Sequence, residues 1–333
     1  MIADIETTEV FETYWHFAVA RQEVYFARLR QAPPPWSQDS IISSFRFTNA
    51  YRAADRVSQY LIRHVIYQDD VPLRPDDILF RILVFKIFNR IDTWELLSTH
   101  LGPITYQRFS VEAFDRVLTE AMAQGTAIYS AAYIMPSGRS LGHRRKHRNH
   151  LALLDHMMRA SLPLKIARAS RMRDVFEFLL SFPTIGPFLA YQYATDINYS
   201  ELTDFSEREF VAPGPGAIDG IRKSISDRAG LTDADIIRRV TDAQIENFER
   251  RGLSFPDLFG RPLQYIDCQN LFCEVGKYSR VAHPEHRGSS GRSRIKQRYV
   301  GEEKLPRPWF PPKWGINERV SDFFGSGGTN GSG

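Results

Sequence analysis

Four polar side chains near residue 270 have a spacing that could support chemistry. Asp267, Asn270, Glu274 and Lys277 follow one another at steps of three and four, so a helix would bring them to one face. Carboxylates beside an ammonium group can perform general acid–base chemistry or bind an anionic leaving group. The same stripe could equally be an ion-pair network that satisfies itself, and the sequence leaves both interpretations open.

A second pattern is the turn in residues 182–190 (FPTIGPFLA), which lies between two apolar segments. Gly186 would let the backbone pass close to a phosphate, and amide groups at the start of the following helix would bind that phosphate. Thr184 belongs to the same turn. Such contacts position DNA without reading its sequence. The alternative is an ordinary connection between two packed helices.

Residues 210–220 (FVAPGPGAIDG) form a third pattern, rich in glycine and proline. Gly214 and Gly216 would fix a turn where the backbone approaches a ligand, and Asp219 would stand near the start of the next helix. This is not a dinucleotide-binding fingerprint, because Asp219 occupies the third glycine position and no strand precedes the run. A purely structural loop between helices is the alternative.

Basic residues are clustered, although the net charge is only +4. Residues 280–313 carry nine Lys or Arg against three acids, and residues 143–148 (HRRKHR) contain no carboxylate. Two such clusters favour a nucleic-acid partner over a merely solvated surface. The cations predicted to contact DNA are Arg144, Arg145, Lys146, Arg148, Arg294 and Lys296.

Helices are expected to position all of these residues. The predicted helices cover residues 11–30, 48–67, 76–83, 110–124, 149–160, 170–182, 188–198 and 263–280. The helix that starts at Asp76 is apolar on most sides and should be central. Capping boxes are expected at Thr232-x-x-Asp235 and Thr241-x-x-Gln244. Residues 137–148 should form an exposed loop. Because no period-two alternation is found, the predicted fold class is all-α.

The predicted domain organisation is a helical domain over residues 1–282, with a helix-hairpin-helix at about 174–198. A basic, Pro-rich, irregular extension over 283–324 should pack on it, and 325–333 should be a flexible tail. Met1–Val10 lacks the apolar core of a signal peptide, and no apolar run reaches the about 18 residues of a membrane span. With only two cysteines, the chain is expected to be cytoplasmic, with no membrane partner.

Several chemistries lack their sequence signatures. The chain has no G-x-x-x-x-G-K-[ST] motif, so it is not expected to be a P-loop kinase on its own. It has no H-E-x-x-H, no zinc-deaminase signature and no G-x-S-x-G motif. No metal and no cofactor are predicted.

Four runs together resemble a known family. These are residues 46–52 (RFTNAYR), 182–199, 210–220 and 267–280, and they resemble the helical domain named after 5-hydroxymethyluracil DNA kinases. The resemblance spans roughly residues 11–316. That family is similar to the alpha-glutamyl/putrescinyl thymine pyrophosphorylases of the helix-hairpin-helix DNA glycosylase superfamily. It implies a helix-hairpin-helix glycosylase-like fold and an enzyme that flips a modified pyrimidine out of DNA.

The resemblance also implies roles for individual residues. Asp219 or Asp196 would serve glycosidic cleavage, whereas Glu274 and Lys277 would serve exchange of a substituent on the base. Phe188 stands where lyase-type relatives carry a lysine, which disfavours a Schiff-base mechanism. The base pocket would be formed by Asn49, Arg52, Tyr133, Gly214, Gly216, Asp267 and Asn270.

Two alternatives stay open at this point. Arg52 could instead form a surface pair with Asp55 or Arg56, the commoner outcome for such a run. The whole chain could also be a catalytically inert DNA-binding module that works beside a separate kinase or another base-modification enzyme. The expected partner in either case is DNA containing modified bases.

Overall fold

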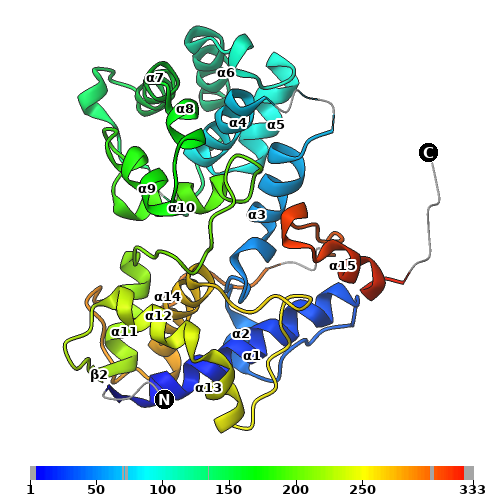
Figure 1. Ribbon diagram of the computed structural model, residues 1–333, viewed down its shortest axis with the longest axis vertical. Helices are drawn as coiled ribbons and strands as arrows, with labels where there is room; N and C mark the ends of the chain where they lie inside the picture. Colours follow the sequence, from blue (N-terminus) through cyan, green and yellow to red (C-terminus); the bar gives the residue numbers. More distant parts are fainter. Residues whose placement is uncertain (1–4, 70, 72–73, 134, 301–303, 326–333) are drawn as a thin grey trace. The chain divides into compact units, whose positions relative to one another are not determined.

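The computed structural model describes residues 5–69, 71, 74–133, 135–300 and 304–325 (Figure 1). The chain divides into two compact units: unit 2 is residues 56–210, and unit 1 combines the segments before and after it. The sequence did not anticipate this division, and the predicted domain boundaries stay a prediction. The predicted tail lies, from residue 326 onward, outside the described residues.

Unit 1 is built around two long helices, α1 (Glu9–Leu29) and α14 (Tyr265–Ala282), which contact one another. Thr8 caps α1 by accepting a hydrogen bond from the Val10 amide. The remaining elements of unit 1 are β1 (Glu6–Thr7), α2 (Ser40–Ser44), η1 (Arg52–Ala54), α11 (Pro215–Ser224), β2 (Ile225–Asp227), α12 (Asp233–Asp242), α13 (Gln244–Arg250), η5 (Pro312–Trp314) and α15 (Asn317–Phe323). Strands β1 and β2 pair antiparallel.

The packing of α11 on α14 sets the geometry of unit 1. A β-carbon at Gly220 would lie 1.9 Å from the Phe272 carbonyl oxygen, and one at Gly276 would lie 2.8 Å from the Gly220 Cα. Because glycines occupy both crossing points, the two backbones approach more closely than side chains would allow. The arrangement brings Asp219 of α11 and the polar face of α14 into the same unit.

Unit 2 surrounds α4 (Pro75–Phe88), whose residues 77–88 are all buried, which confirms the predicted central helix. Pro75 occupies its first turn, where a missing amide does no harm. The remaining elements of unit 2 are α3 (Arg56–Tyr60), the π-helix η2 (Leu61–Ile66), α5 (Ile91–Leu101), η3 (Tyr106–Arg108), α6 (Val111–Ala123), η4 (Arg139–Leu141), α7 (Lys146–Arg159), α8 (Leu162–Ala167), α9 (Met172–Leu180) and α10 (Pro187–Ile197).

The prediction of a mainly helical fold is confirmed. The described residues also contain two short strands, β1 and β2, which the sequence did not predict. Two local predictions are wrong. Residues 48–67 do not form one helix: residues 56–66 are helical in α3 and η2, but side chains of distant segments bind the amides of Thr48 and Arg52, and residues 48–55 are extended or in a short turn. Thr241 does not cap α13, because its hydroxyl donates to the Ile237 carbonyl inside α12. The capping box at Thr232 and Asp235 is present.

Within the described residues, no helix combines the length and the apolar character that crossing a bilayer requires. The finer prediction, a helix-hairpin-helix glycosylase-like fold, stays a prediction. Its local basis, α9 and α10 joined by a short turn, is present.

Candidate functional site

Asp267 uses both carboxylate oxygens on backbone amides. One oxygen accepts from Gln264 at the start of α14 (3.0 Å), and the other accepts from the Arg52 amide (2.8 Å). The carboxylate therefore caps the helix and fastens the distant 48–55 segment to it. Arg52 is 1% exposed, so the interpretation of Arg52 as half of a surface pair is wrong. Asn270, one turn further along α14, is half-buried.

Glu274 and Lys277 form the second contact between α14 and the same segment. Glu274 Oε2 accepts from the Thr48 amide at 3.0 Å and pairs with Lys277 Nζ at 2.7 Å. Lys277 Nζ also donates to the Arg46 carbonyl and lies 4.6 Å from the centre of the Phe47 ring. The predicted polar stripe of α14 therefore exists, and it meets residues 46–55 over most of its length.

Asp55 joins this cluster although the sequence did not single it out for chemistry. Its carboxylate accepts from the Asn49 amide (2.8 Å), and Asn49 is held in turn by the Ala54 carbonyl and by Arg21. Burial raises the pKa of Asp55 to about 7, and the negative charge of Glu274 adds to this, against the Asn49 amide and Arg21. Asp55 can thus hold or release a proton near neutral pH. We call Asp55, Asp267, Glu274 and Lys277 the α14 cluster.

The glycines of residues 214–216 serve packing in this structure. The Gly214 amide donates to Gln269 Oε1 at 3.2 Å, and a β-carbon at Gly216 would lie 2.3 Å from Cys273 Sγ. Both contacts fix the turn against α14, and contact of these glycines with a base stays a prediction. Asp219, one turn along α11, is 3% exposed and accepts a hydrogen bond from the Ser290 amide at 2.8 Å.

Unit 2 holds the other predicted carboxylate in a buried ion pair. Asp196 on α10 is fully buried and lies 3.0 Å from Lys86 Nζ on α4, which is 3% exposed. Lys86 also donates to Asn89 Oδ1 and lies 4.6 Å from the centre of the Tyr133 ring. Tyr133 is half-buried and stacks on Phe188, with ring centres 5.8 Å apart.

The turn before α10 differs in one detail from its sequence interpretation. Thr184 adopts the left-handed backbone conformation (φ 70°), whereas Gly186 has φ −85°, which any residue can adopt. Gly186 is exposed, and a β-carbon there would meet nothing within 4 Å. The open space in front of Gly186 fits the predicted close approach of a phosphate, which stays a prediction. A special backbone conformation is not the reason for a glycine there.

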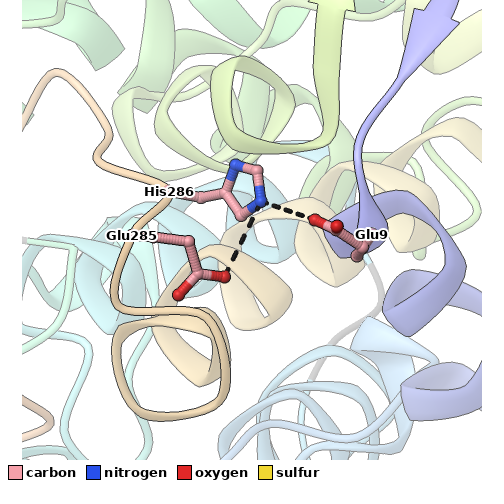
Figure 2. Close-up of side chains that lie close together, drawn as sticks. All are labelled: Glu9, Glu285 and His286. Carbon is pink, nitrogen blue, oxygen red and sulfur yellow. Dashed lines mark hydrogen bonds and ion pairs between the residues drawn. The ribbon is translucent and has the colours of Figure 1, made fainter.

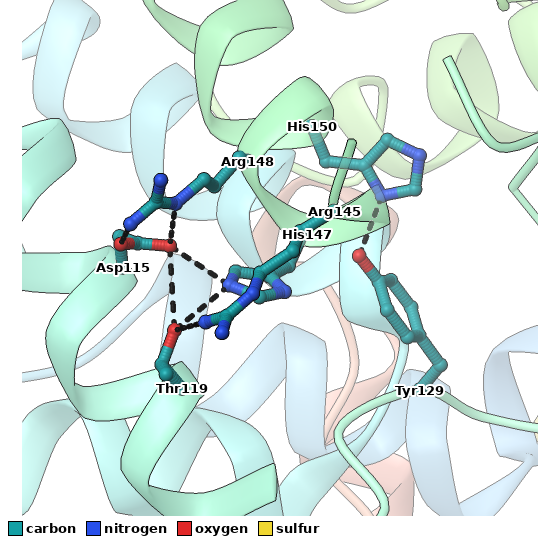
Figure 3. Close-up of polar contacts among 7 residues, drawn as sticks. All are labelled: Asp115, Thr119, Tyr129, Arg145, His147, Arg148 and His150. Carbon is teal, nitrogen blue, oxygen red and sulfur yellow. Dashed lines mark hydrogen bonds and ion pairs between the residues drawn. The ribbon is translucent and has the colours of Figure 1, made fainter. Parts of the chain in front are cut away.

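The basic run at residues 143–148 is partly tied down rather than a free loop (Figure 3). Arg148 Nε donates to Asp115 at 2.8 Å, and His147 Nε2 lies 2.8 Å from the same carboxylate. Hydrogen bonding to Arg148 holds the pKa of Asp115 below its usual value. Arg145 donates to Thr119 at 3.0 Å.

Tyr129 makes two contacts with residues of α7, of which Figure 3 shows the one with His150. Lys146 Nζ lies 4.4 Å from the centre of the Tyr129 ring, and the Tyr129 hydroxyl lies 2.7 Å from His150 Nδ1. Arg144, Arg145 and Arg148 are exposed residues. The run therefore begins a helix, and its guanidinium groups differ in how firmly they are already held.

Comparison with known proteins places the chain in a family. The family model described as the helical domain of 5-hmdU DNA kinase matches residues 8–288. The chain belongs to this family. The resemblance expected from the sequence is thereby confirmed.

One curated relative of this 5-hmdU DNA kinase helical-domain protein is the 5-hmdU DNA kinase of Bacillus phage SP10. The two are 24% identical over 294 residues, which cover 83% of this chain and 46% of the phage protein. The chain thus spans about half the length of that relative. No solved structure matches the chain.

Near the N-terminus of this family member, three potential metal ligands gather in unit 1 (Figure 2). The ligand atoms of Glu9, Glu285 and His286 lie within 4.8 Å of one another, and His286 Nε2 lies 2.8 Å from Glu9 Oε2. Both glutamates are exposed. These contacts tie the segment after α14 to the start of α1, a role that no sequence pattern indicated.

A groove of about 560 Å³ also lies in unit 1, along α1. Its walls include Glu9, His16, Asp39, Tyr278 and His283. None of the residues proposed from the sequence as catalytic or as base pocket lines it. Asp55 is a further site residue that the sequence patterns did not single out. The signal that could have indicated it is the spacing Arg52-x-x-Asp55, which was interpreted as a surface pair.

Proposed function

We propose that this chain binds DNA that carries a 5-hydroxymethyl pyrimidine and acts on that base during hypermodification. The family supports the substrate class, because its description names 5-hmdU DNA kinase. The observation that carries the chemistry is the α14 cluster, where Asp55, with its pKa raised to about 7, lies in the electrostatic range of Glu274. One carboxyl group that retains a proton near another that is bound by a cation supplies an acid and a base in one place.

In this proposal Glu274 and Lys277 act at the substituent on C5 of the base. Lys277 would stabilise negative charge on the departing oxygen or phosphate, and Glu274 or Asp55 would take the proton from the water or amine that forms the new bond in its place. Phosphoryl transfer from ATP is not assigned to these residues, because the chain carries no P-loop sequence. A kinase on a partner domain or a separate protein would supply that step.

DNA binding is assigned to unit 2 and to the segment after α14. Arg144, Arg145, Arg294 and Lys296 have exposed side chains suited to backbone phosphates, and Gly186 leaves open space before α10. Asn49, Arg52 and Asn270 would form the base pocket next to the α14 cluster. Extrusion of the base into such a pocket costs a few kcal/mol, and least for a base that pairs weakly.

A catalytically inert DNA-binding module is the second candidate, and a specific observation favours it. Two of the carboxylates predicted to be catalytic already have partners inside the fold, Asp196 on Lys86 and one oxygen of Asp219 on the Ser290 amide, and Asp267 of the predicted base pocket binds two amides. Glycosidic cleavage by Asp196 would in addition require a fully buried side chain to become accessible. Cleavage is therefore the weaker chemical alternative.

The decisive experiment is incubation of the protein with duplexes that contain 5-hydroxymethyluracil, 5-hydroxymethylcytosine or their phosphorylated and aminated derivatives. Mass spectrometry would detect altered nucleosides, free bases and abasic sites. Glu274→Gln and Asp55→Asn are the test variants, and Glu249→Gln, an exposed glutamate on α13, is the matched control.

We expect an altered base that remains attached to DNA, formed by wild type and Glu249→Gln but not by Glu274→Gln. A released base that depends on Asp196 or Asp219 would replace the proposal with a glycosylase. Unchanged substrates with persistent DNA binding would establish the inert module.

A further inference from the structure

The carboxylate of Asp219 is buried beneath the backbone of a distant segment. It lies on α11 and is 3% exposed. Its Oδ1 accepts from the Ser290 amide at 2.8 Å, and a β-carbon at Gly288 would lie only 2.2 Å from the same oxygen. Its Oδ2 has no hydrogen-bond partner among the described residues and lies 3.8 Å from Lys223 Nζ. A nearly buried carboxylate is thus left half-satisfied under a glycine.

Lys223 does not complete the site. Its ammonium group donates to the Gly276 carbonyl at 2.7 Å and to Ser279 Oγ at 3.3 Å, so it serves α14 more closely than Asp219. Burial lowers the pKa of Lys223, against the opposing effect of Asp219. What closes over Asp219 is therefore the chain at residues 288–290.

We call residues 287–296 the strap. Its sequence (RGSSGRSRIK) contains four cations and no acid. The four cationic side chains are exposed, and they are Arg287, Arg292, Arg294 and Lys296. Only Ile295 is buried, at 8% exposure. The strap therefore presents a positive outer surface while its backbone covers a negative charge.

Both ends of the strap are fastened within unit 1. Before it, His286 contacts Glu9 (Figure 2), and His283 contacts Thr13. After it, Gln297 accepts a hydrogen bond from the Arg46 amide at 3.1 Å. Between these points the strap is held by the Asp219 contact and by a bond of 3.3 Å from Arg280 to the Arg294 carbonyl. A segment tied at its ends and lightly held in the middle can lift without unfolding the unit.

We infer that the strap is a phosphate-binding cover whose lifting from Asp219 is coupled to DNA binding. A phosphate on the strap brings a like charge toward the buried Asp219 carboxylate, so closure and DNA binding oppose one another. Coupling of this kind is reciprocal: DNA binding weakens the Asp219 contact by the same factor by which that contact weakens DNA binding. This inference rests on the proposed DNA binding and makes Asp219 accessible only when DNA is present.

The first test measures, without DNA, how firmly the strap is held on Asp219; we call this contact the latch. Trypsin cleavage after Arg287, Arg292 and Arg294 would be followed by mass spectrometry in wild type, Gly288→Ala, Asp219→Asn and Asp322→Asn. Gly288→Ala adds one methyl group against Asp219 without changing charge, and Asp322→Asn removes the same charge from an exposed site. We expect strap cleavage about five-fold faster in Gly288→Ala, the factor for one net hydrogen bond, faster by a smaller factor in Asp219→Asn, whose amide oxygen can still accept from Ser290, and unchanged in Asp322→Asn. Equal rates in all four proteins would overturn the latch.

The second test measures the coupling. Fluorescence anisotropy with a short labelled duplex would give affinities of the same four proteins at low and at physiological salt. We expect Gly288→Ala and Asp219→Asn to bind about five-fold more tightly than wild type, and Asp322→Asn to bind within about two-fold. If Gly288→Ala frees the strap but leaves the affinity of a DNA-binding wild type unchanged, the inference fails and the proposed function stands. If wild type binds no DNA, the proposed function fails even where the proteolysis confirms a latch.

Discussion

The α14 cluster of unit 1 and the Lys86–Asp196 pair of unit 2 contain the same kinds of charged group in opposite arrangements. In unit 2, one carboxylate and one ammonium group face each other at 3.0 Å with almost no exposure. In unit 1, most hydrogen bonds to the carboxylates come from backbone amides, and Lys277, at 17% side-chain exposure, pairs with Glu274. Burial, together with the negative charge of Glu274, raises the pKa of Asp55 to about 7 against the Asn49 amide and the charges of Arg21 and Arg52, so this carboxyl group can hold a proton near neutral pH.

This difference teaches how burial divides the charged residues between stability and chemistry. A fully buried ion pair is required for stability, because removal of either partner leaves an isolated buried charge in the fold. A partly exposed cluster that contains a carboxyl group with a pKa near 7 can exchange protons with a substrate. The following predictions break or sharpen this contrast, from the largest expected effect to the smallest.

Loss of one partner of the unit 2 pair should have the largest effect. Lys86→Met leaves the Asp196 carboxylate buried without its cation, so we expect the free energy of unfolding to fall by about 3–5 kcal/mol in urea denaturation. The control is Arg159→Met, which removes an exposed pair with Asp155 and should change stability by less than about 1 kcal/mol. Similar losses for both variants would abolish the distinction drawn for unit 2.

The two units also differ in the role of a glycine: Gly220 of unit 1 permits close helix packing, whereas Gly186 of unit 2 faces open space. Gly220→Ala would place a methyl group 1.9 Å from the Phe272 carbonyl, so we expect a loss of about 1–3 kcal/mol. Gly186→Ala meets no atom within 4 Å and should change stability by less than about 0.5 kcal/mol. If a phosphate passes close to Gly186, that second variant should nevertheless bind DNA more weakly. Thermal unfolding and anisotropy measure the two effects, and a stable, fully DNA-binding Gly186→Ala would remove this turn from the interface.

The proton on Asp55 makes a pH-dependent contribution of a definite sign. Its pKa is raised from 3.8 to about 7, so the folded state binds this proton more tightly than the unfolded chain. The associated stability is present below about pH 4 and is lost as the pH rises to about 7. Relative to Asp55→Asn, wild type should therefore lose stability over that window, by a few kcal/mol at about 1.4 kcal/mol per pKa unit. Parallel curves for the two proteins in urea titrations from pH 4 to 8 would show that Asp55 is not protonated in the fold.

The smallest contrast lies within the basic run of unit 2. Arg148 is already bonded to Asp115, whereas the exposed Arg144 has greater freedom to meet a phosphate. Arg144→Gln should reduce the salt dependence of DNA binding by about one phosphate contact, and Arg148→Gln by less. Affinities measured at several salt concentrations test this order. The reverse order would mean that DNA displaces Asp115 from Arg148.

The sequence predicted best the elements whose stabilising pattern is local. The apolar periodicity of α1, α4 and α14 placed these helices within a few residues of their observed bounds. It also predicted that Glu274 and Lys277 share a face, because helical geometry alone requires it. Family membership followed from the order of four short runs.

What could not be predicted depends on partners far apart in the chain. The stretch 48–67 has helical periodicity, yet Glu274 and Asp267 capture its amides from more than 200 residues away. The burial of Arg52, the raised pKa of Asp55 and the cover over Asp219 arise from the same long-range packing. The spacing of residues within one segment does not indicate contacts with distant segments. The sequence therefore placed Arg52 and Asp55 on the surface and predicted no partner for Asp219.

The division of the chain into units has a consequence for its biosynthesis. Unit 2 is continuous in sequence, so all its helices leave the ribosome before α11 does. The leading segment of unit 1, by contrast, contains α1 and the amides that α14 must bind, and it waits for some two hundred further residues. Unit 2 can therefore fold during translation, while the apolar face of α1 stays uncovered until α14 emerges. Chaperones that bind nascent chains would be expected to act on this first helix.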